Sequence, residues 1–454
     1  MSLALNEYIL DDIINITSNK VDTKNLVLQQ YISTENMLPD RKGICLAASM
    51  PSGKVNQFLK NDTLFSNIRT YFRKVWFASF DGGSSPDVLI FRTKDAEVLD
   101  PRFLYYLISD QKFIDYSDKT SKGAKMPRGD KSAILNYKTY LPTLSVQKRI
   151  SKILSDLDDK IYLNNQTNQT LESIAQAIFK SWFIDFDPVR AKIAAKQEGK
   201  DAELAAMCAI SGKSETELEQ MAKDDFAELQ ATAALFPDEL VESELGEVPK
   251  GWEVTRFNKI ILQYIDNRGK TPPTQIDGIP LLEVKHLPEG SLNPDLNTEK
   301  RVSLETFNNW FRAHLQEDDL IISTVGTIGR LCIIPADKKL TIAQNILGLR
   351  FKKDEVNPLF MYYQMDSYKF RNDVNARLVI TVQASIKRKD LETIDLLKPD
   401  INIQNIFAEK IKPFVLSQQS DESLKLIDIR DTLLPKLLSG EIDVSDFQGE
   451  VAGT

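Results

Sequence analysis

Apolar residues in the first part of the chain fall into short runs. The runs 43–47, 75–78 and 88–91 lie between turn residues, which predicts strands. Between residues 101 and 116 the apolar positions instead follow helical spacing, and this segment is predicted to be helical. Residues 1–144 are therefore predicted to form one domain of mixed α/β structure.

The pattern changes between residues 145 and 183, where glycine and proline are absent and apolar residues recur every seven positions. The two heptad positions are occupied by Ile150, Leu157, Asn164, Leu171 and Ile178, and by Leu154, Ile161, Asn168, Ala175 and Trp182. Such a repeat predicts a coiled-coil seam, and a helix of this length spans about 60 Å. Asn164 and Asn168 either disfavour slipped registers or mark an exposed break in the helix.

The second half of the chain repeats this order. Residues 184–250 are rich in Ala, Glu, Lys and Gln, and we expect an acidic helical insert or linker. Residues 251–400 are again predicted to be mixed α/β, and 401–440 to form a second long helix. Pro413 predicts a kink or a break in that helix. The tail, 441–454, is predicted to be flexible.

Several motifs occur twice, at a constant separation of 257 residues. The corresponding pairs are residues 62–73 and 319–330, residues 100–106 and 357–363, and Gln147 and Gln404. Two copies of one unit in one polypeptide make a pseudo-dimer, which usually binds something that itself has two halves. The predicted fold class is α+β, with two mixed α/β domains joined by two long antiparallel helices. These helices form a coiled-coil spacer, and a pseudo-twofold axis relates the two halves.

The net charge of −8 is unevenly distributed. Residues 197–250 hold 14 acidic and 4 basic side chains, a net of −10, so the rest of the chain carries +2. Local basic clusters, rather than the total charge, decide whether a protein contacts phosphate groups. The acidic total therefore does not exclude nucleic-acid binding by the two repeats.

The cysteines and histidines exclude several kinds of site. Cys45, Cys208 and Cys332 lie far apart without a CxxC pair, which argues against a disulfide framework and a zinc site and fits a reducing cytosol. Only His286 and His314 are present, so we expect no histidine-based metal site or catalytic triad. No apolar run reaches 18 residues and no signal peptide is recognisable, so a cytoplasmic protein without a membrane span is expected.

This layout resembles the specificity (S) subunit of Type I restriction-modification enzymes. The segments that carry the resemblance are 62–73, 144–154, 158–161, 173–183, 247–252, 319–329 and 433–440. Segments 62–73 and 319–329 resemble two forms of a sequence motif found in the target-recognition domains of that family. Segment 247–252 resembles the phrase that opens such a domain, and the first repeat lacks it. The resemblance covers nearly the whole chain.

The resemblance assigns a role to each segment. Residues 1–144 and 251–400 would be the first and second target-recognition domains, each reading one half of a bipartite DNA site. Helices 145–183 and 401–440 would set the gap between the halves and dock two modification subunits. Those subunits would hold S-adenosylmethionine and methylate adenine, and restriction subunits would use ATP and Mg²⁺. The chain itself would hold no catalytic centre, cofactor or metal.

Basic residues in both repeats are candidates for contact with double-stranded DNA, because Lys and Arg bind phosphates and Arg can bind guanine. The candidates are Arg69, Arg73, Lys74, Lys119, Lys122, Lys125, Arg128, Lys131, Arg268, Lys270, Arg330, Arg377, Lys387 and Arg388. Five of them lie in a loop with Gly123, Pro127 and Gly129, which predicts a mobile basic loop. The alternative is a solvated surface loop without a binding role.

Apolar residues on the long helices beyond the seam are candidates for contact with partner subunits. These are Phe179, Trp182, Phe183, Phe407 and Phe414. The alternative interpretation is that they pack on the neighbouring domains.

The sequence leaves two alternative functions. One is a self-contained methyltransferase or nuclease. A methyltransferase would need a glycine-rich cofactor loop and an Asn/Asp-Pro-Pro-aromatic tetrapeptide, and the chain has neither. It also lacks a P-loop, so no ATP-driven motor is expected. Asp277, Glu283 and Lys285 have the spacing of a nuclease site, but such spacing is common in charged sequences. A coiled-coil scaffold without a role in DNA binding is the other alternative.

Overall fold

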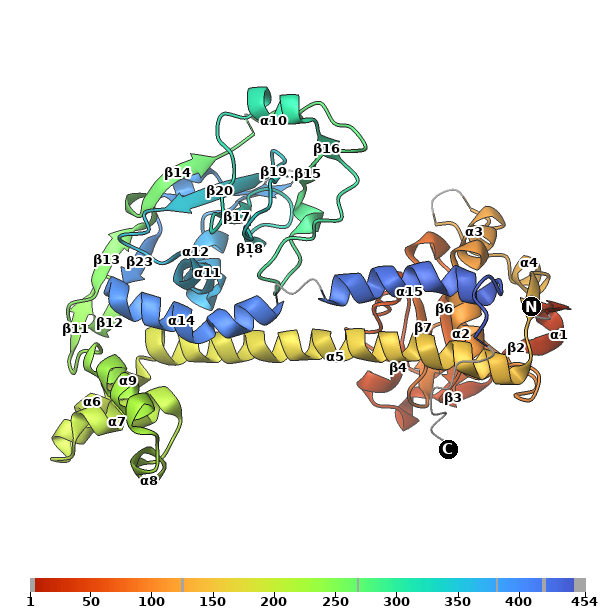
Figure 1. Ribbon diagram of the computed structural model, residues 1–454, viewed down its shortest axis with the longest axis horizontal. Helices are drawn as coiled ribbons and strands as arrows, with labels where there is room; N and C mark the ends of the chain where they lie inside the picture. Colours follow the sequence, from red (N-terminus) through yellow and green to blue (C-terminus); the bar gives the residue numbers. More distant parts are fainter. Residues whose placement is uncertain (1–4, 124–125, 268, 381–382, 419–421, 445–454) are drawn as a thin grey trace. The chain divides into compact units, whose positions relative to one another are not determined.

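The computed structural model describes residues 5–123, 126–267, 269–380, 383–418 and 422–444 (Figure 1). The chain forms two compact units. The first comprises Met1–Asn165 and Asp421–Thr454, and the second comprises Gln166–Ser420. Each unit holds part of the long helices and one of the two domains that the resemblance predicts to recognise DNA, called below the first and the second recognition domain.

The first recognition domain is built on two small sheets. One has the strand order β2-β9-β6-β7, and all its pairings are antiparallel. Its strands are β2 (Ile14–Ile16), β9 (Val88–Thr93), β6 (Thr63–Ser66) and β7 (Val75–Phe77). The other has the order β3-β5-β8-β4, with β3 (Lys20–Asp22), β5 (Lys54–Phe58), β8 (Gly82–Ser84) and β4 (Tyr31–Ile32). Strands β1 (Asn6–Ile9) and β10 (Lys138–Leu141) form a separate antiparallel pair.

The predicted helical segment 101–116 forms two helices. They are α2 (Pro101–Ser109) and α3 (Gln111–Lys119), and the short helices of this domain are α1 (Leu10–Ile13) and α4 (Lys131–Leu135). Asp100 caps α2 by accepting a hydrogen bond from the Phe103 N–H at 2.8 Å. The strand predictions for 75–78 and 88–91 are confirmed, but the one for 43–47 is wrong. Ile44 forms only an isolated bridge with Met37, so this apolar run has no partner strand.

The second recognition domain repeats the first. Its antiparallel sheet has the order β14-β20-β17-β18, with β14 (Ile261–Ile265), β20 (Ile346–Phe351), β17 (Leu320–Ser323) and β18 (Leu331–Ile333). A smaller sheet has the order β16-β15-β19, with β16 (Arg301–Val302), β15 (Ile279–Leu282) and β19 (Thr341–Ile342). Strand β13 (Glu253–Arg256) pairs with β23 (Asp395–Lys398), and β21 (Val379–Ile380) pairs with β22 (Ala384–Ser385). The helices are α10 (Leu304–Trp310), α11 (Pro358–Asp366), α12 (Tyr368–Asn375) and α13 (Arg388–Leu391).

The same hydrogen-bond pattern fixes each recognition domain to a long helix. The Gln147 side chain accepts from the Asp100 N–H at 2.9 Å and donates to the carbonyl oxygens of Val98 and Pro142. The Gln404 side chain makes the same three bonds, to the N–H of Asn357 and the carbonyl oxygens of Glu355 and Pro399. All four pairs of residues are 257 apart in sequence, so the internal repeat extends to individual buried contacts.

The predicted spacer consists of α5 (Leu144–Phe183), α14 (Ile401–Gln418) and α15 (Glu422–Leu438). Within each unit α5 runs antiparallel to its partner, α15 in the first unit and α14 in the second (Figure 1). All ten predicted seam residues of α5 are buried or half-buried. Helix α5 is continuous through Asn164, whose side chain donates to Glu422 at 2.9 Å, so the alternative of a break there is wrong. Helix α14 is not broken at Pro413.

The acidic insert is helical only in part. Its helices are α6 (Asp187–Gln197), α7 (Ala202–Ser211), α8 (Glu215–Glu219) and α9 (Lys223–Ala234), and they are followed by a hairpin of β11 (Leu240–Ser243) and β12 (Gly246–Pro249). In Figure 1 these helices lie on one side of α5, and the second recognition domain lies on the other. The ring of Phe236 packs edge-on against Trp182, with centroids 5.3 Å apart. This contact joins the insert to the end of α5.

The tail differs in part from the prediction of flexibility. Val444 is buried in the core of the first unit, and Ile442 packs against the same core. Residues 445–454 lie outside the described part of the chain. None of the helices in the described ranges has the length and apolar character that crossing a bilayer requires.

Candidate nucleic-acid interface

In the first recognition domain, the repeated segment 62–73 contains a turn that is hydrogen-bonded to a basic hairpin. Strand β6 leads into this turn, at residues 67–69. The N–H of Arg69 donates to the Pro127 oxygen at 3.0 Å, and the N–H of Gly129 donates to the Asn67 oxygen at 3.1 Å. Lys122 and Arg128 pair across the hairpin through two backbone hydrogen bonds of 2.8 and 2.9 Å. The hairpin and the turn therefore form one surface feature.

The second recognition domain has the same feature at the same offset. The N–H of Gly326 donates to the Ala384 oxygen at 3.0 Å, and the N–H of Ile386 donates to the Thr324 oxygen at 2.9 Å. Isolated bridges link Ile68 to Arg128 in the first domain and Val325 to Ser385 in the second. Each of these positions has its counterpart 257 residues away. We define the two features by their described residues, as the first turn–hairpin (67–69 with 122–123 and 126–129) and the second turn–hairpin (324–326 with 379–380 and 383–386).

The predicted DNA-contacting residues of the first domain divide into free and paired cations. Arg69, Lys119 and Lys131 are exposed, and their side chains make no hydrogen bond or ion pair within the described part of the chain. Lys122 pairs with Asp130, and Arg128 pairs with Asp87 at 3.0 Å. A hydrogen bond from Lys122 lowers the pKa of the Asp130 carboxyl. Lys125 lies outside the described residues.

Arg73 and Lys74 are engaged with other parts of the first unit, and their contact with DNA stays a prediction. Lys74 Nζ donates to the Thr34 carbonyl oxygen at 2.6 Å. Arg73 is half-buried and lies 3.9 Å from a carboxylate oxygen of Asp431 on α15. Burial, together with the neighbouring charge of Arg41, lowers the pKa of Arg73. Both cations are engaged inside the first unit.

In the second domain, three of the five predicted cations that the structure describes have partners. Arg330 lies 3.1 Å from Glu289, and Arg388 lies 3.2 Å from Glu392 with its guanidinium over the Tyr264 ring. Arg377 donates to the Thr393 hydroxyl and to the Asp373 carbonyl oxygen. Lys270 and Lys387 are exposed, and neither has an ionic partner among the residues described. Arg268 lies outside the described residues.

The structure favours packing over docking for the residues predicted to bind partners. Phe179, Trp182, Phe183 and Phe407 are buried in the core of the second unit, and Phe414 packs against it. The Phe179 ring lies 5.6 Å from the rings of both Phe360 and Phe407. These side chains pack in the core between α5, α14 and the second recognition domain. They therefore offer almost no surface to another chain.

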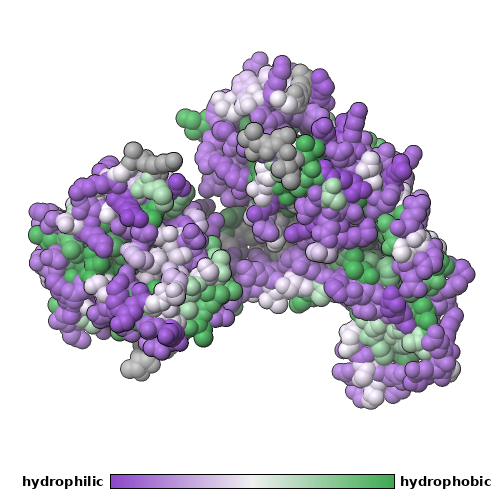
Figure 2. Space-filling view, turned by 180° about the vertical axis from the view of Figure 1, so that it is seen from behind, coloured by the Kyte–Doolittle hydropathy of each residue, from purple (hydrophilic) through white to green (hydrophobic). Residues whose placement is uncertain are grey.

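Other apolar residues of the long helices are exposed, and the sequence analysis missed them. They are Tyr162, Leu163 and Ile174 on α5, Leu416 on α14, and Leu424 and Ile429 on α15. Hydrophilic residues cover most of the face shown in Figure 2, and apolar residues form separate small patches. The signal that could have found Leu163 and Ile174 is their position outside the heptad seam, where a solvent-facing helix normally carries polar residues.

A buried ion pair occurs in both domains and was also missed. Asp62 accepts two hydrogen bonds of 2.7 Å from the Arg92 guanidinium. Asp319 accepts from Arg350 at 2.9 and 2.7 Å. The aspartates are 257 residues apart but the arginines are 258 apart, so a search at constant offset does not pair them.

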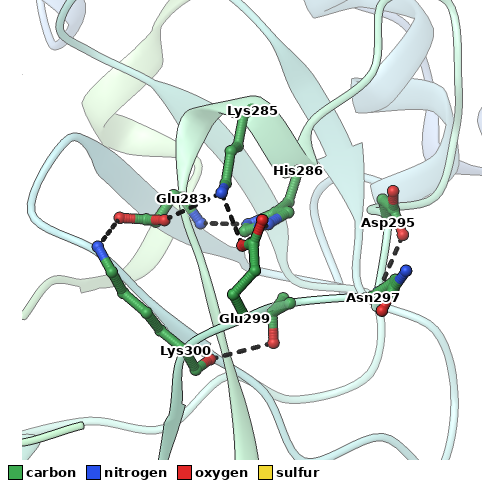
Figure 3. A network of polar contacts seen from close by, with 8 residues as sticks. Glu283, Lys285, His286, Asp295, Asn297, Glu299 and Lys300 are labelled. Carbon is green, nitrogen blue, oxygen red and sulfur yellow. Dashed lines mark hydrogen bonds and ion pairs between the residues drawn. The ribbon is translucent and has the colours of Figure 1, made fainter. Parts of the chain in front are cut away.

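Two of the three residues with nuclease spacing, Glu283 and Lys285, belong to a network of ion pairs (Figure 3). Lys285 lies 2.6 Å from Glu299, and Lys300 lies 2.7 Å from Glu283. The hydrogen bond from Lys285 lowers the pKa of Glu299 to about 2. Lys285 also lies 3.7 Å from Glu283. The Asp277 backbone oxygen accepts a hydrogen bond from the Gln275 side chain. Across the described ranges, no group of acidic, His and Cys side chains is arranged to hold a metal ion.

Comparison with known proteins identifies the family. The family model for the Type I restriction modification DNA specificity domain matches residues 6–173 and 249–426. The Type I restriction enzyme HindI specificity subunit of Haemophilus influenzae is 30% identical over 96% of this chain and 99% of its own length. The MjaIX specificity subunit of Methanocaldococcus jannaschii is 24% identical over 76% of this chain and 70% of its own length.

A solved structure shares the fold. The S subunit of a Type I restriction-modification system from M. genitalium matches with a TM-score of 0.50 at 11% identity, covering 97% of this chain and 96% of that one. The family model covers both repeats, and the Haemophilus relative aligns over almost its whole length. The chain therefore belongs to the family of Type I restriction enzyme specificity subunits.

Proposed function

We propose that this chain is the DNA-recognition subunit of a Type I restriction-modification complex, and that each recognition domain reads one half of a two-part DNA site. The duplicated turn–hairpin carries this proposal. Both copies are held by the same backbone hydrogen bonds, and exposed cations lie in or beside each. A feature present once in each repeat suits a ligand that presents two related half-sites.

The free cations provide the sequence-independent part of the binding energy. Lys119 and Lys131 flank the first turn–hairpin, and Lys387 follows the second. Because these ammonium groups have no ionic partner in the described part of the chain, contact with phosphate would break no existing ion pair. The acidic insert repels phosphate and is not expected to contact DNA. Direct base contacts then add sequence specificity to this phosphate binding.

Filter binding of the assembled complex to DNA, titrated with salt, tests the proposal. The affinity of the wild-type complex is expected to fall steeply with salt, because bound phosphates release counterions. A Lys119→Gln/Lys131→Gln double variant is expected to bind all sequences more weakly, with the salt slope reduced by about 2. Lys213→Gln, an exposed lysine of the insert, serves as the control and should match the wild type. DNA retention that stays at background at every salt concentration would instead support a scaffold role.

The long helices are the proposed docking site for the modification subunits. These partner subunits would hold S-adenosylmethionine, and restriction subunits would add ATP and Mg²⁺. Within the first unit, Leu163 of α5 and Leu424 of α15 are 57% and 58% exposed, although both lie on helices with a well-packed seam. Exposed apolar residues on such a surface are suited to bury against a partner.

Replacing Leu163 and Leu424 by aspartate is expected to weaken binding of the modification subunits at least about tenfold, because each change places a charge in an apolar interface. Co-purification with the modification subunits measures the effect. Leu262→Asp is the matched control, since Leu262 is 64% exposed on strand β14, away from the helices. Equal recovery of the partner subunits by all three proteins would contradict docking at this surface.

A further inference from the structure

Arg69 has an unfavourable backbone conformation at the centre of the first turn–hairpin. Its φ and ψ are 51° and 60°, in the left-handed region. The counterpart 257 residues later is Gly326, with a φ of 82°. The N–H of each residue donates a 3.0 Å hydrogen bond to its hairpin, at Pro127 and at Ala384. The backbone is therefore the same in both repeats, but only the second has the residue type that suits it.

Glycine adopts this conformation without a steric penalty, whereas a residue with a Cβ atom is disfavoured. The second repeat shows that the fold itself needs no side chain here. Backbone strain that persists in a folded protein tends to occur at functional sites. An arginine in place of glycine at this turn thus suggests that its side chain has a use that offsets the strain.

The guanidinium of Arg69 has no structural role in the described part of the chain. It is exposed, and it makes neither a hydrogen bond nor an ion pair there. Arg73, four residues later, is also left-handed, with a φ of 52°, but its guanidinium faces Asp431 inside the first unit. On the hairpin, Arg128 is paired with Asp87 and Lys122 with Asp130. Among the described cations of the turn and the hairpin, Arg69 is the one without an ionic partner.

The local setting holds Arg69 in a defined position. Backbone hydrogen bonds at Asn67 and at Arg69 itself fix the turn to the hairpin. Tyr71 and Phe72 follow it, 48% and 39% exposed, with ring centroids 4.7 Å apart. A lysine on a flexible loop is sufficient for phosphate binding, whereas bidentate contact with a guanine is favoured by a rigid mount and the planar fork of arginine.

We propose that Arg69 is a specificity-determining residue of the first recognition domain and reads a guanine through its O6 and N7 atoms in the major groove. This pairing is the commonest specific contact between arginine and DNA. The second domain lacks the contact, because Gly326 occupies the same position. The inference rests on the proposed function and adds which residue discriminates bases, in which half-site, and for which base.

Mapping of methylated adenines in cells that express the complex tests the proposal. The full chain is produced with its modification subunits as wild type, Arg69→Gly or Arg69→Lys. Both variants are expected to lose preference for guanine at one base pair of one half-site by roughly 5- to 150-fold. The other half-site should be unchanged. Arg69→Lys keeps the charge but loses the bidentate fork, so it separates base reading from phosphate binding.

The controls keep the outcomes distinct. Arg69→Gly introduces the residue that the second repeat tolerates at the same backbone position, so its thermal unfolding should match the wild type. Lys119→Gln should weaken binding without changing the motif. An unaltered motif in both Arg69 variants overturns the proposal, as does weaker binding by Arg69→Gly alone with the motif intact, which would identify a phosphate contact. A wild-type complex without a two-part motif would instead refute the proposed function.

Discussion

Replacing Asp431 by alanine is expected to lower the free energy of unfolding of the first unit by about 3 kcal/mol. Asp431 lies on α15 and binds Arg41 and the neighbouring Arg430, whose side chains are 1% and 7% exposed. Breaking a buried ion pair leaves an uncompensated charge, which typically costs about 3–5 kcal/mol. The lower end of that range applies because the Asp431 side chain is itself 34% exposed.

Each arginine depends differently on Asp431. Arg430 also binds Asp158 of α5 at 2.8 Å and would keep that partner. Arg41 contacts no other carboxylate in the described part of the chain, and its Nε and Nη1 atoms have no hydrogen-bond partner there. Removing Asp431 therefore affects Arg41 most. Arg41 belongs to the first recognition domain and Asp431 to α15. The substitution therefore weakens the attachment of α15 to that domain.

Chemical denaturation and hydrogen exchange measure this effect. Faster amide exchange in α15 is expected together with the lower unfolding free energy. Asp428→Ala is the matched control, because Asp428 is exposed on the same helix, and its effect should stay within about 0.5 kcal/mol. An Asp431→Ala protein as stable as this control would show that the ion cluster does not hold α15.

The pH dependence of this contribution follows from the surroundings of Asp431. Burial raises the pKa of its carboxyl, but the charges of Arg41, Arg430 and Arg73 outweigh burial and hold the pKa below its usual value. A depressed folded-state pKa stabilises the folded protein fully above the unfolded-state pKa, which is about 3.9 for aspartate. The stabilisation decreases as the pH falls below that value.

The internal repeat made the architecture predictable from sequence. A constant offset of 257 residues requires both halves to fold alike, and the equivalent sheets β2-β9-β6-β7 and β14-β20-β17-β18 have the same strand order. The heptad pattern predicted the buried face of α5 because a helix must cover its apolar stripe. The run 43–47 shows where such reasoning fails. Apolar residues alone do not make a strand without a neighbour to pair with.

The interface was less predictable, because its properties depend on contacts between distant residues. Arg128 and Lys119 look alike in sequence, but Arg128 is paired with Asp87, 41 positions away, while Lys119 is free in the described part of the chain. Similarly, Phe179 and Trp182 were recognisable as candidates for contacts beyond the coiled-coil seam. The sequence did not show that these contacts are made with the second recognition domain and α14. The strain at Arg69 is visible only beside Gly326, and only once the backbone is known.

Replacing Asp319 by alanine is expected to lower the free energy of unfolding of the second unit by about 3–5 kcal/mol, because it leaves Arg350 without its carboxylate. Asp319 is 2% exposed and accepts three hydrogen bonds, two from Arg350 and one from the Gln316 N–H. The Arg350 side chain is only 15% exposed, so water cannot fully replace the lost partner. Thermal or denaturant unfolding measures the change.

Asp62→Ala in the first domain provides a natural comparison. Asp62 makes the same three contacts, but the side chain of Arg92 is 31% exposed, so the unpaired charge can be hydrated more easily. We therefore expect a smaller loss from Asp62→Ala than from Asp319→Ala. Losses in the opposite order would mean that burial of the arginine does not set the cost.

A double-mutant cycle separates the ion pair from the other contacts of Asp319. In the Asp319→Ala/Arg350→Met protein no unpaired charge remains, so it should be more stable than Asp319→Ala alone. The recovery should be incomplete, because the Gln316 N–H still lacks its acceptor and Arg350 no longer donates to the His314 carbonyl oxygen. A double variant that shows the simple sum of the two single losses would mean that the side chains do not interact, although two hydrogen bonds join them.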